Sequence, residues 1–290
     1  MSLKSMTKIA PGDAPRVTVL MSVCDGEKHL REAVDSILAQ TFSDFEFLIV
    51  NDGSTDGTRD ILDSYHDERL RIVHQENTGL IRALNTGLQL ARSEYVARMD
   101  ADDVSHPLRL EMQLGVLDSN PYVDLVASFC RLIDGDGRLF DHAEMETDGI
   151  YRLWILQFRN AYVHGSVTYR RQRVVDLQGY REHCLHAEDY DLWLRMTSAH
   201  SAAVIPTYLY DLRMWPESIS QRFQEAQQKM AAEISCRALR LCDPSLTPED
   251  LSGMRPLYPG TGPGELTLAG LKSLIGTLEG FCARYGVGAQ

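Results

Sequence analysis

The sequence predicts an α/β fold with a Rossmann-like, mostly parallel, doubly wound sheet. Near-continuous apolar runs alternate with amphipathic stretches through the first 120 residues, and strands buried on both faces are typical of parallel sheets. Three of the first four predicted strands end in acidic residues. Because the carboxyl ends of such strands form the ligand crevice of an open α/β sheet, the same pattern predicts a binding site there.

Four predicted strands alternate with four predicted helices in the first half of the chain. The strands cover Arg16 to Val23, Phe45 to Val50, Leu70 to His74 and Tyr95 to Met99. Each strand precedes a stretch whose apolar residues recur three and four positions apart, as one face of a helix requires. The fourth helix is expected from Pro107 to Leu117. This order implies right-handed crossovers that return every strand to one sheet.

The pattern after residue 120 predicts a small antiparallel part followed by C-terminal helices. The expected elements are a strand pair from Val123 to Phe140, a helix from Thr147 to Phe158, a strand from Gly165 to Tyr169, a helix that opens at His186 to Asp189, late strands from Ala202 to Ile205 and from Leu209 to Arg213, and helices from Phe223 to Leu241 and from Thr267 to Tyr285. Pro244 to Gly264 is expected to be a linker, because it is rich in proline and glycine.

Composition excludes several classes of protein. The net charge of −12 argues against broad binding to a nucleic-acid backbone. The sequence has neither an apolar run long enough to cross a membrane nor the apolar core of a signal peptide. The six cysteines are scattered, without the spacing of a zinc site. We therefore expect reduced thiols and a cytoplasmic location, with peripheral contact at the inner face of the cell membrane as an open alternative.

Three carboxylates follow the fourth predicted strand within four positions, at Asp100, Asp102 and Asp103. Carboxylates this close repel one another unless a positive group lies among them. A hard divalent cation shared with a phosphorylated ligand would meet that need. The alternative is an acidic surface turn that opens the next helix. The first strand is not followed by a Gly-x-Gly-x-x-Gly motif, and the chain has no Walker loop, which weakens the dehydrogenase and phosphate-loop readings.

The order of four motifs resembles the family 2 glycosyltransferases. The motifs are Val17 to Leu30 with Ser36 to Phe42, Val50 to Asp56, Asp100-Ala101-Asp102, and Glu188 to Arg195. The resemblance covers about Arg16 to Ser220 and implies a GT-A fold that transfers a sugar from a nucleoside diphosphate. It implies a catalytic domain at 16–222, with a nucleotide-binding half at 16–120 and an acceptor half at 121–222. Residues 1–15 are expected to be a disordered leader, and 223–290 a helical extension.

The resemblance assigns the donor site to residues at the strand ends. Asp52 would accept a hydrogen bond from the ring N–H of a uracil or similar base, although a carboxylate there can also simply cap a turn. Val23 and Asp25 would line the same base pocket. Arg82 would pair with a carboxylate or the diphosphate, unless it is simply a solvent-exposed arginine. Relatives carry an aromatic-Asn pair where this chain has Cys24-Asp25, so the preferred base stays open.

The resemblance also divides the acidic segment into roles. Asp100 would contact the ribose or base, Ala101 lies between the two donor-binding acids, and Asp102 would ligate Mn²⁺ or Mg²⁺ held by the diphosphate. Asp103 is expected to cap the following helix. Many relatives carry a histidine near the late strand where this chain has Trp215. The metal shell would then be one ligand short, bind its ion weakly, or recruit Glu217.

Asp189 is the candidate general base, which would take the proton of an acceptor hydroxyl in a single inverting displacement. Acids also favour helix starts for dipole reasons, so an ordinary first-turn acid is the alternative. Glu188 is expected to position acceptor or donor. His164 lies where acceptor-side residues could fall, although a lone histidine is more often structural.

These observations together predict an inverting, metal-assisted glycosyltransferase that uses a nucleoside diphosphate sugar, with UDP as the expected nucleotide. The acceptor is expected to be a saccharide or a lipid-linked saccharide, and a homodimer is an open possibility. The Gln-x-x-Arg-Trp signature of processive synthases is absent, which favours transfer of one sugar. The alternatives are a nucleotide-sugar-binding protein with weakened turnover and a sugar-nucleotide pyrophosphorylase.

Overall fold

A computed structural model describes residues 14–197, 201–216, 218–254 and 268–287. The strands are β1 Val17–Val23, β2 Phe45–Asp52, β3 Leu70–Gln75, β4 Tyr95–Met99, β5 Val104–Ser105, β6 Leu125–Ile133, β7 Leu139–Ala143, β8 Thr168–Arg170 and β9 Ala202–Arg213. The α-helices are α1 Leu30–Leu38, α2 Thr58–Asp63, α3 Leu80–Leu90, α4 Arg109–Ser119, α5 Gly149–Leu156, α6 Arg171–Asp176, α7 Glu188–Met196, α8 Ile219–Arg222, α9 Gln224–Cys242, α10 Pro248–Gly253 and α11 Leu268–Tyr285. Two short 3₁₀ helices cover His164–Ser166 and Glu182–Cys184.

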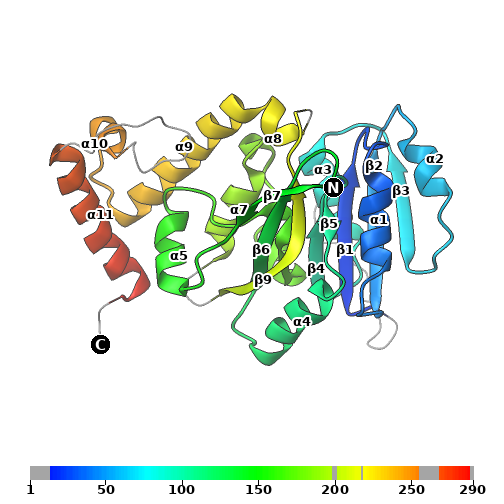
Figure 1. Ribbon diagram of the computed structural model, residues 1–290. Coiled ribbons are helices and arrows are strands. Elements are labelled where there is room, and N and C mark those ends of the chain that lie inside the picture. Colours follow the sequence, from blue (N-terminus) through cyan, green and yellow to red (C-terminus); the bar gives the residue numbers. More distant parts are fainter. Residues whose placement is uncertain (1–13, 198–200, 217, 255–267, 288–290) are drawn as a thin grey trace.

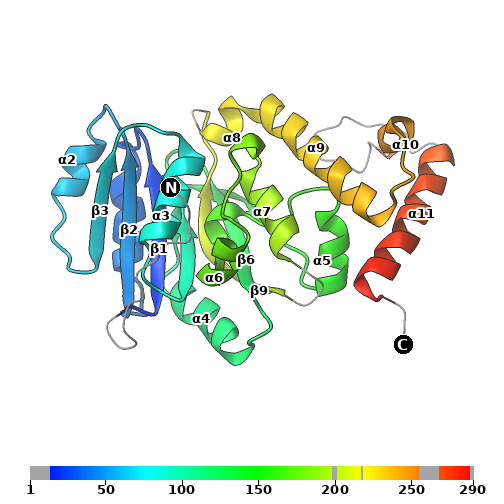
Figure 2. The same ribbon diagram turned by 180° about the vertical axis from the view of Figure 1, so that it is seen from behind.

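The strands form one mixed sheet in the order β3-β2-β1-β4-β8-β6-β9-β5, and β7 pairs with β6. The strands β3, β2, β1 and β4 are parallel, and β8 runs antiparallel to both β4 and β6. Helices cover both faces of this sheet (Figures 1 and 2). The predicted α/β sheet, mostly parallel with a smaller antiparallel part, is confirmed.

The structure differs from the predicted elements in the second half of the domain. The two late strands are one strand, β9, whose pairing with β6 is irregular between Ile205 and Tyr208. Pro206 lies in this gap and has no N–H to pair, which explains why the sequence looked interrupted there. The strand β5 was not predicted, because two residues are too short to show a periodic pattern. The helix α10 lies inside the expected linker.

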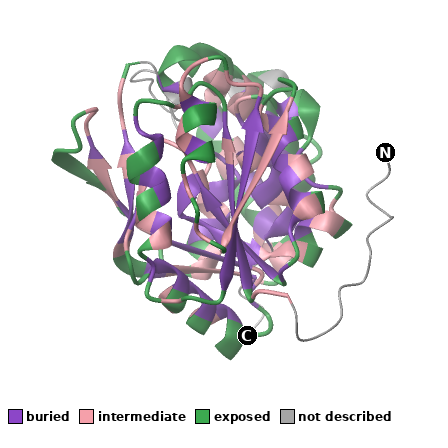
Figure 3. Ribbon diagram, turned by 90° about the vertical axis from the view of Figure 1, so that its right-hand side faces the viewer, coloured by how far each residue is buried: buried purple, intermediate pink, exposed green. Residues whose placement is uncertain are grey.

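Two buried clusters of apolar side chains pack against the sheet, which is itself largely buried (Figure 3). One cluster joins β1 and β2 to α3, α7, α9 and α11. The other joins the sheet to α1 and α4. The C-terminal helices lie at the end of the molecule opposite β3 (Figure 1). Side chains of α9 and α11 belong to the same buried cluster as those of α7. The proposed domain boundary at residue 222 stays a prediction.

The helix α3 approaches β1 closely at Gly87. A methyl group at this position would lie 2.2 Å from Leu20 Cδ1, and Leu20 is fully buried. Only a residue without a side chain lets the two elements pack at this distance. The turn at the end of β3 leads directly into α3. The close packing of α3 on β1 therefore also positions that turn beside the neighbouring strand ends.

We predict that Gly87→Ala destabilises the protein by about 1–3 kcal/mol through overpacking, although alanine is the better helix former. Gly115→Ala is the matched control, because Gly115 is exposed in α4 and a methyl group there meets nothing within 4 Å. The control should gain up to about 1 kcal/mol. Denaturant unfolding measures both changes, and equal effects of the two substitutions would contradict the close contact.

Candidate active site

The acidic segment at 100–103 connects β4, in the middle of the sheet, to β5, which pairs with β9. Its carboxylates therefore lie between the end of a central strand and the end of a strand formed much later in the chain. Each of the three carboxylates has a different partner. Separate protein partners thus relieve the repulsion among the three carboxylates, and the arrangement does not require a metal ion at each of them.

Asp100 pairs with a buried cation from its own strand. Arg98 Nη2 lies 2.6 Å from Asp100 Oδ1, and the Arg98 side chain is 1% exposed while that of Asp100 is 33% exposed. Burial lowers the pKa of Arg98, but Asp100 more than offsets this and the pKa is raised overall. Asp100 thus balances a buried charge and still reaches the surface.

Asp103 does not cap the following helix, and that prediction was wrong. The chain forms β5 directly after Asp103, and α4 begins only at Arg109, with Leu108 at its N-cap position. Asp103 is buried. It accepts hydrogen bonds of 2.7 Å from the Tyr210 hydroxyl and from the Arg213 backbone N–H. Burial, with Asp102 and Asp100 nearby, raises the pKa of Asp103 well above its ordinary value. Its role is to tie β9 to the acidic segment.

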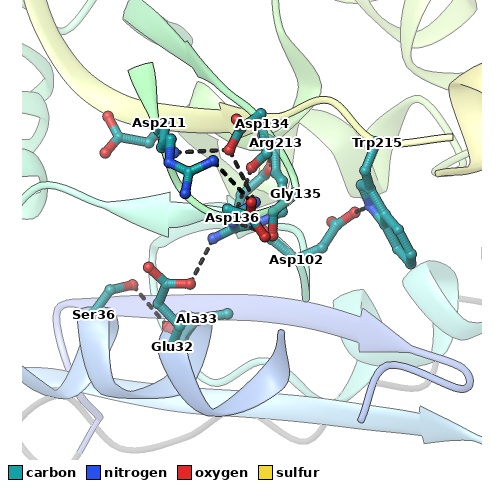
Figure 4. Close-up of polar contacts among 12 residues, drawn as sticks. Glu32, Ala33, Ser36, Asp102, Asp134, Gly135, Asp136, Asp211, Arg213 and Trp215 are labelled. Carbon is teal, nitrogen blue, oxygen red and sulfur yellow. Dashed lines mark hydrogen bonds and ion pairs between the residues drawn. The ribbon is translucent and has the colours of Figure 1, made fainter. Parts of the chain in front are cut away.

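Asp102 accepts a hydrogen bond from Trp215, whose Nε1–H lies 2.8 Å from Asp102 Oδ2 (Figure 4). Lys28 Nζ lies 4.5 Å from the centre of the Trp215 ring, and the His29 ring meets its edge at 5.1 Å. Burial and Asp100 raise the pKa of Asp102, and the Trp215 bond partly opposes them. The indole therefore engages one oxygen of the proposed metal ligand. Glu217, the suggested substitute ligand, lies outside the described residues.

Arg213 contacts the acidic segment, α1 and the turn after β6 at the same time (Figure 4). Its Nε donates to the Asp102 carbonyl oxygen at 2.7 Å, and Nη2 lies 2.6 Å from Glu32 Oε2 on α1. Its Nη1 donates to the Asp134 carbonyl oxygen in the turn between β6 and β7 at 3.1 Å. One buried guanidinium thus fixes the acidic segment relative to both halves of the sheet.

The proposed nucleotide residues lie at the ends of β1 and β2, which are neighbours in the sheet. Asp52 is buried and holds the turn before α3, because it accepts from Thr78 N–H at 2.9 Å and Gly79 N–H at 2.8 Å. Asp25 adopts a left-handed φ of 52° and accepts from Thr55 N–H at 2.7 Å. Val23 is buried beside them. Both carboxylates therefore shape the loops around the strand ends.

Arg82 forms an exposed bidentate pair with Glu182, with bonds of 3.0 and 2.9 Å. Arg82 therefore pairs with a carboxylate and is also exposed to solvent, so the pair is consistent with both expectations for this residue. His164 lies against the core, with Nε2 3.0 Å from the Tyr180 hydroxyl and its ring 5.9 Å from that of Trp193. Burial, with Arg98 nearby, lowers the pKa of His164 well below its ordinary value. These contacts favour a neutral, structural imidazole.

Asp189 lies in the first turn of α7 and lines a pocket of about 440 Å³. The Asn160 side-chain amide donates to Asp189 Oδ2, and the Tyr190 N–H donates to Oδ1, both at 2.7 Å. Burial raises the pKa of Asp189, and Asp100 is close enough to raise it further. A carboxylate with a raised pKa in a pocket is a candidate base. Asp100 and Asp189 are thus near enough for the charge of one to affect the other.

Glu188 precedes this carboxylate and is buried. Its Oε2 has no hydrogen-bond partner among the described residues. Burial and then Asp189 raise the pKa of Glu188, as expected when two carboxylates share a poorly solvated place. The pair therefore holds a proton more readily than isolated carboxylates do.

A metal ion would find few ligands here. In the described ranges, no group of three or more His, Cys, Asp or Glu side chains is arranged to hold one. Asp102 nevertheless fits a hard cation, because it is a carboxylate oxygen donor with a second carboxylate, Asp100, nearby. A cation that also binds the phosphates of a ligand would supply the missing ligands.

The sequence profile described as "Glycosyl transferase family 2" matches residues 18–176. The chain belongs to this family. Two relatives agree with the assignment. The O-antigen biosynthesis glycosyltransferase WbnJ of Escherichia coli is 34% identical over 62% of this chain and 71% of its own. The amylovoran biosynthesis glycosyltransferase AmsE of Erwinia amylovora is 30% identical over 71% of this chain and 79% of its own. The pyrophosphorylase alternative is thereby displaced.

Solved structures show that this glycosyltransferase has the GT-A fold. The Staphylococcus aureus protein TarS, solved in complex with UDP-GlcNAc, matches with a TM-score of 0.65 at 17% identity, over 93% of this chain and 81% of TarS. The mannosyltransferase PcManGT of Pyrobaculum calidifontis, solved with GDP-Man and Mn²⁺, matches with a TM-score of 0.58 at 21% identity, over 99% of this chain and 80% of its own. Within the described ranges, the glycosyltransferase has no helix that is both long and apolar enough to span a membrane.

Sequence reasoning missed three residues of this glycosyltransferase site. Asn160 orients Asp189, Lys28 lies over Trp215, and Arg213 braces the acidic segment. Sequence signals existed for Lys28, which follows the first strand inside a matched motif, and for Arg213, which lies two positions before Trp215 in the late family pattern. Asn160 acts through a residue that is distant in sequence, and no local signal marks it.

We predict that Asp103→Ala destabilises the protein by roughly 2–4 kcal/mol, because the Tyr210 hydroxyl and the Arg213 N–H would both lose a buried acceptor. Asp103→Asn keeps an acceptor oxygen and removes a buried charge, so it should cost clearly less. Denaturant unfolding at neutral pH compares the two. A helix-capping role would instead predict a loss of about 0.5–2 kcal/mol for Asp103→Ala and almost none for Asp103→Asn, because asparagine caps helices about as well as aspartate.

Proposed function

We propose that this glycosyltransferase moves a sugar from a UDP-sugar to a saccharide or lipid-linked saccharide, with inversion and with Asp189 as general base. The observation that supports it most is Asp189 itself, a carboxylate with a raised pKa that lines a pocket and is oriented by Asn160. In the reaction, an acceptor hydroxyl oxygen bonds to the anomeric carbon. The bond from that carbon to the diphosphate oxygen breaks, and Asp189 takes the hydroxyl proton.

The strand ends are the proposed donor site. Val23, Asp25 and Asp52 would surround the base, and Asp100 would contact the ribose. Asp52 already accepts several hydrogen bonds from the turn at 75–79, so the turn would fix its position toward the base. One structural neighbour was solved with a UDP-sugar and another with a GDP-sugar. Guanine is therefore the alternative donor base to compare with uracil.

Asp102 is the proposed ligand of Mn²⁺ or Mg²⁺, the ions that suit carboxylate and phosphate oxygens. Such an ion, when bound, neutralises negative charge on the departing diphosphate. Burial and, after it, the nearby Asp100 raise the pKa of Asp102. A bound cation would offset both effects, which supports the assignment. The chain's own part is to hold Asp102 in place through Arg213 and Trp215.

A second candidate function is a nucleotide-sugar-binding protein with weakened turnover. The observation that favours it is the Trp215 hydrogen bond to Asp102, because Trp215 stands where relatives carry a metal ligand.

We further propose a cytoplasmic location, with contact at the inner membrane face if the acceptor is lipid-linked. We also propose that the protein can form a homodimer.

We predict that UDP release from a panel of UDP-sugars with Mn²⁺ falls about 10²- to 10⁴-fold in Asp189→Asn. Asp102→Ala should raise the Mn²⁺ concentration needed and lower turnover. Asp60→Asn and Asp60→Ala are matched controls, because Asp60 is exposed on α2. A parallel panel of GDP-sugars tests the base. Undiminished turnover in both site variants would rule out the mechanism, and binding of UDP without turnover in the wild type would favour the second function.

The pH profile tests Asp189 independently. A base must be ionised to act, so kcat/KM should fall as pH drops through its raised pKa, and this acid limb should lie above the ordinary range for aspartate. The Asn160 bond lowers that pKa, because it stabilises the charged form. We therefore predict that Asn160→Ala moves the acid limb to higher pH. An unmoved limb would show that another group controls it.

A further inference from the structure

The pocket beside Asp189 has a second wall that comes from the C-terminal extension. Its first wall is the start of α7 and the segment Arg159-Asn160, and the charges of Arg159 and Asp189 in this wall are opposite in sign. Its second wall is formed by Gln224, Gln227, Gln228 and Ala231 of α9. The helix α9 packs against α7, and the two lie together in both ribbon views (Figures 1 and 2). The family match ends at residue 176, so this wall lies outside it.

The two halves of α9 differ in what they contact. In the C-terminal half, Ile234, Ala238, Leu239 and Cys242 are buried, and the Ser235 hydroxyl donates to the Gln157 carbonyl oxygen at 2.7 Å. The N-terminal half contributes exposed or half-buried side chains. The core thus anchors one end of the helix, and the other end extends over the pocket.

The glutamine side chains of this half have no hydrogen-bond partner among the residues that the structure describes. Gln224, Gln227 and Gln228 form no side-chain hydrogen bond within the described parts of the chain, although Asn160 across the pocket donates to Asp189. A side-chain amide both donates and accepts hydrogen bonds. Sugar hydroxyls have the same dual character, so three free amides facing one cavity match a hydroxyl-rich ligand.

A stacked pair of rings lies at the pocket, and His186 of this pair is one of its lining residues. The His186 and Phe223 rings lie 4.4 Å apart and 15° from parallel, and His186 has a left-handed φ of 72°. Phe223 immediately precedes α9. This contact holds the start of α9 against the loop before α7, so the glutamines keep their place above Asp189.

We propose that this pocket binds the acceptor as a neutral saccharide, whose hydroxyls are held by the free amides of α9. The inference rests on the proposed function, since it takes Asp189 to be the base. A volume of about 440 Å³ falls within the roughly 300–1,000 Å³ typical of small-molecule sites. The extension thus selects the acceptor, and the strand ends bind the donor.

The test measures binding of octyl glycosides of glucose, galactose and N-acetylglucosamine by saturation-transfer NMR, with UDP present. Gln227→Met and Gln228→Met keep side-chain length and helix propensity but remove the amide. Each should weaken glycoside binding roughly fivefold, the value of one lost hydrogen bond. Lys229→Met is the matched control, because Lys229 is exposed on the same helix and does not line the pocket. Octyl glucuronide and octyl phosphate are the anionic comparison.

Donor hydrolysis without acceptor separates this inference from the proposed function. It should be equal in wild type, Lys229→Met and both glutamine variants, while transfer to the bound glycoside shows a raised acceptor KM in the glutamine variants only. Equal glycoside binding by all four proteins, no binding to the wild type, or binding of the anionic probes alone would overturn the pocket assignment. Unchanged turnover in Asp189→Asn would overturn the base and leave the binding result to decide the pocket.

Discussion

The central constraint on this structure is the crowding of three carboxylates at the end of β4. Like charges at this spacing oppose folding, and each is offset separately. Asp100 pairs with buried Arg98, Asp102 accepts from Trp215, and Asp103 accepts from groups on β9. Two of these three partners come from more than a hundred residues later in the chain. The carboxylates therefore gain these partners only when β9 is paired in the sheet.

Much of the fold could be predicted because its signals are local. Apolar runs, helical periodicity and acids at strand ends each lie within a short window, and they gave the parallel half and the position of Asp189 at a helix start. The role of Asp103 could not be predicted, because its acceptor contacts join residues 107 and 110 positions away. The substitution of Trp215 for a histidine was visible in the sequence. Its bond to Asp102 was not, since it depends on where the chain turns after β9.

The helix α9 illustrates a different limit. Its periodicity predicted a buried stripe through Ala226, Met230, Ile234 and Leu241. Ile234 is buried and Met230 is half-buried, but Ala226 and Leu241 are exposed. Periodicity says nothing about what the polar side faces. Three glutamines on a helix normally indicate contact with water, and only the position of α7 beside them gives those amides a cavity to line. The sequence pattern therefore predicted the helix and left its surroundings undetermined.

The bonds from Asp103 to β9 also bear on how segments can be exchanged between relatives. The profile match ends at residue 176, which makes that point attractive for recombining donor and acceptor halves. A junction there would separate the acidic segment from Tyr210, Arg213 and Trp215, which donate hydrogen bonds to Asp102 and Asp103. The segment that must be inherited together is therefore longer than the profile match. A hybrid that keeps its own strand β9 through Trp215 retains these hydrogen bonds.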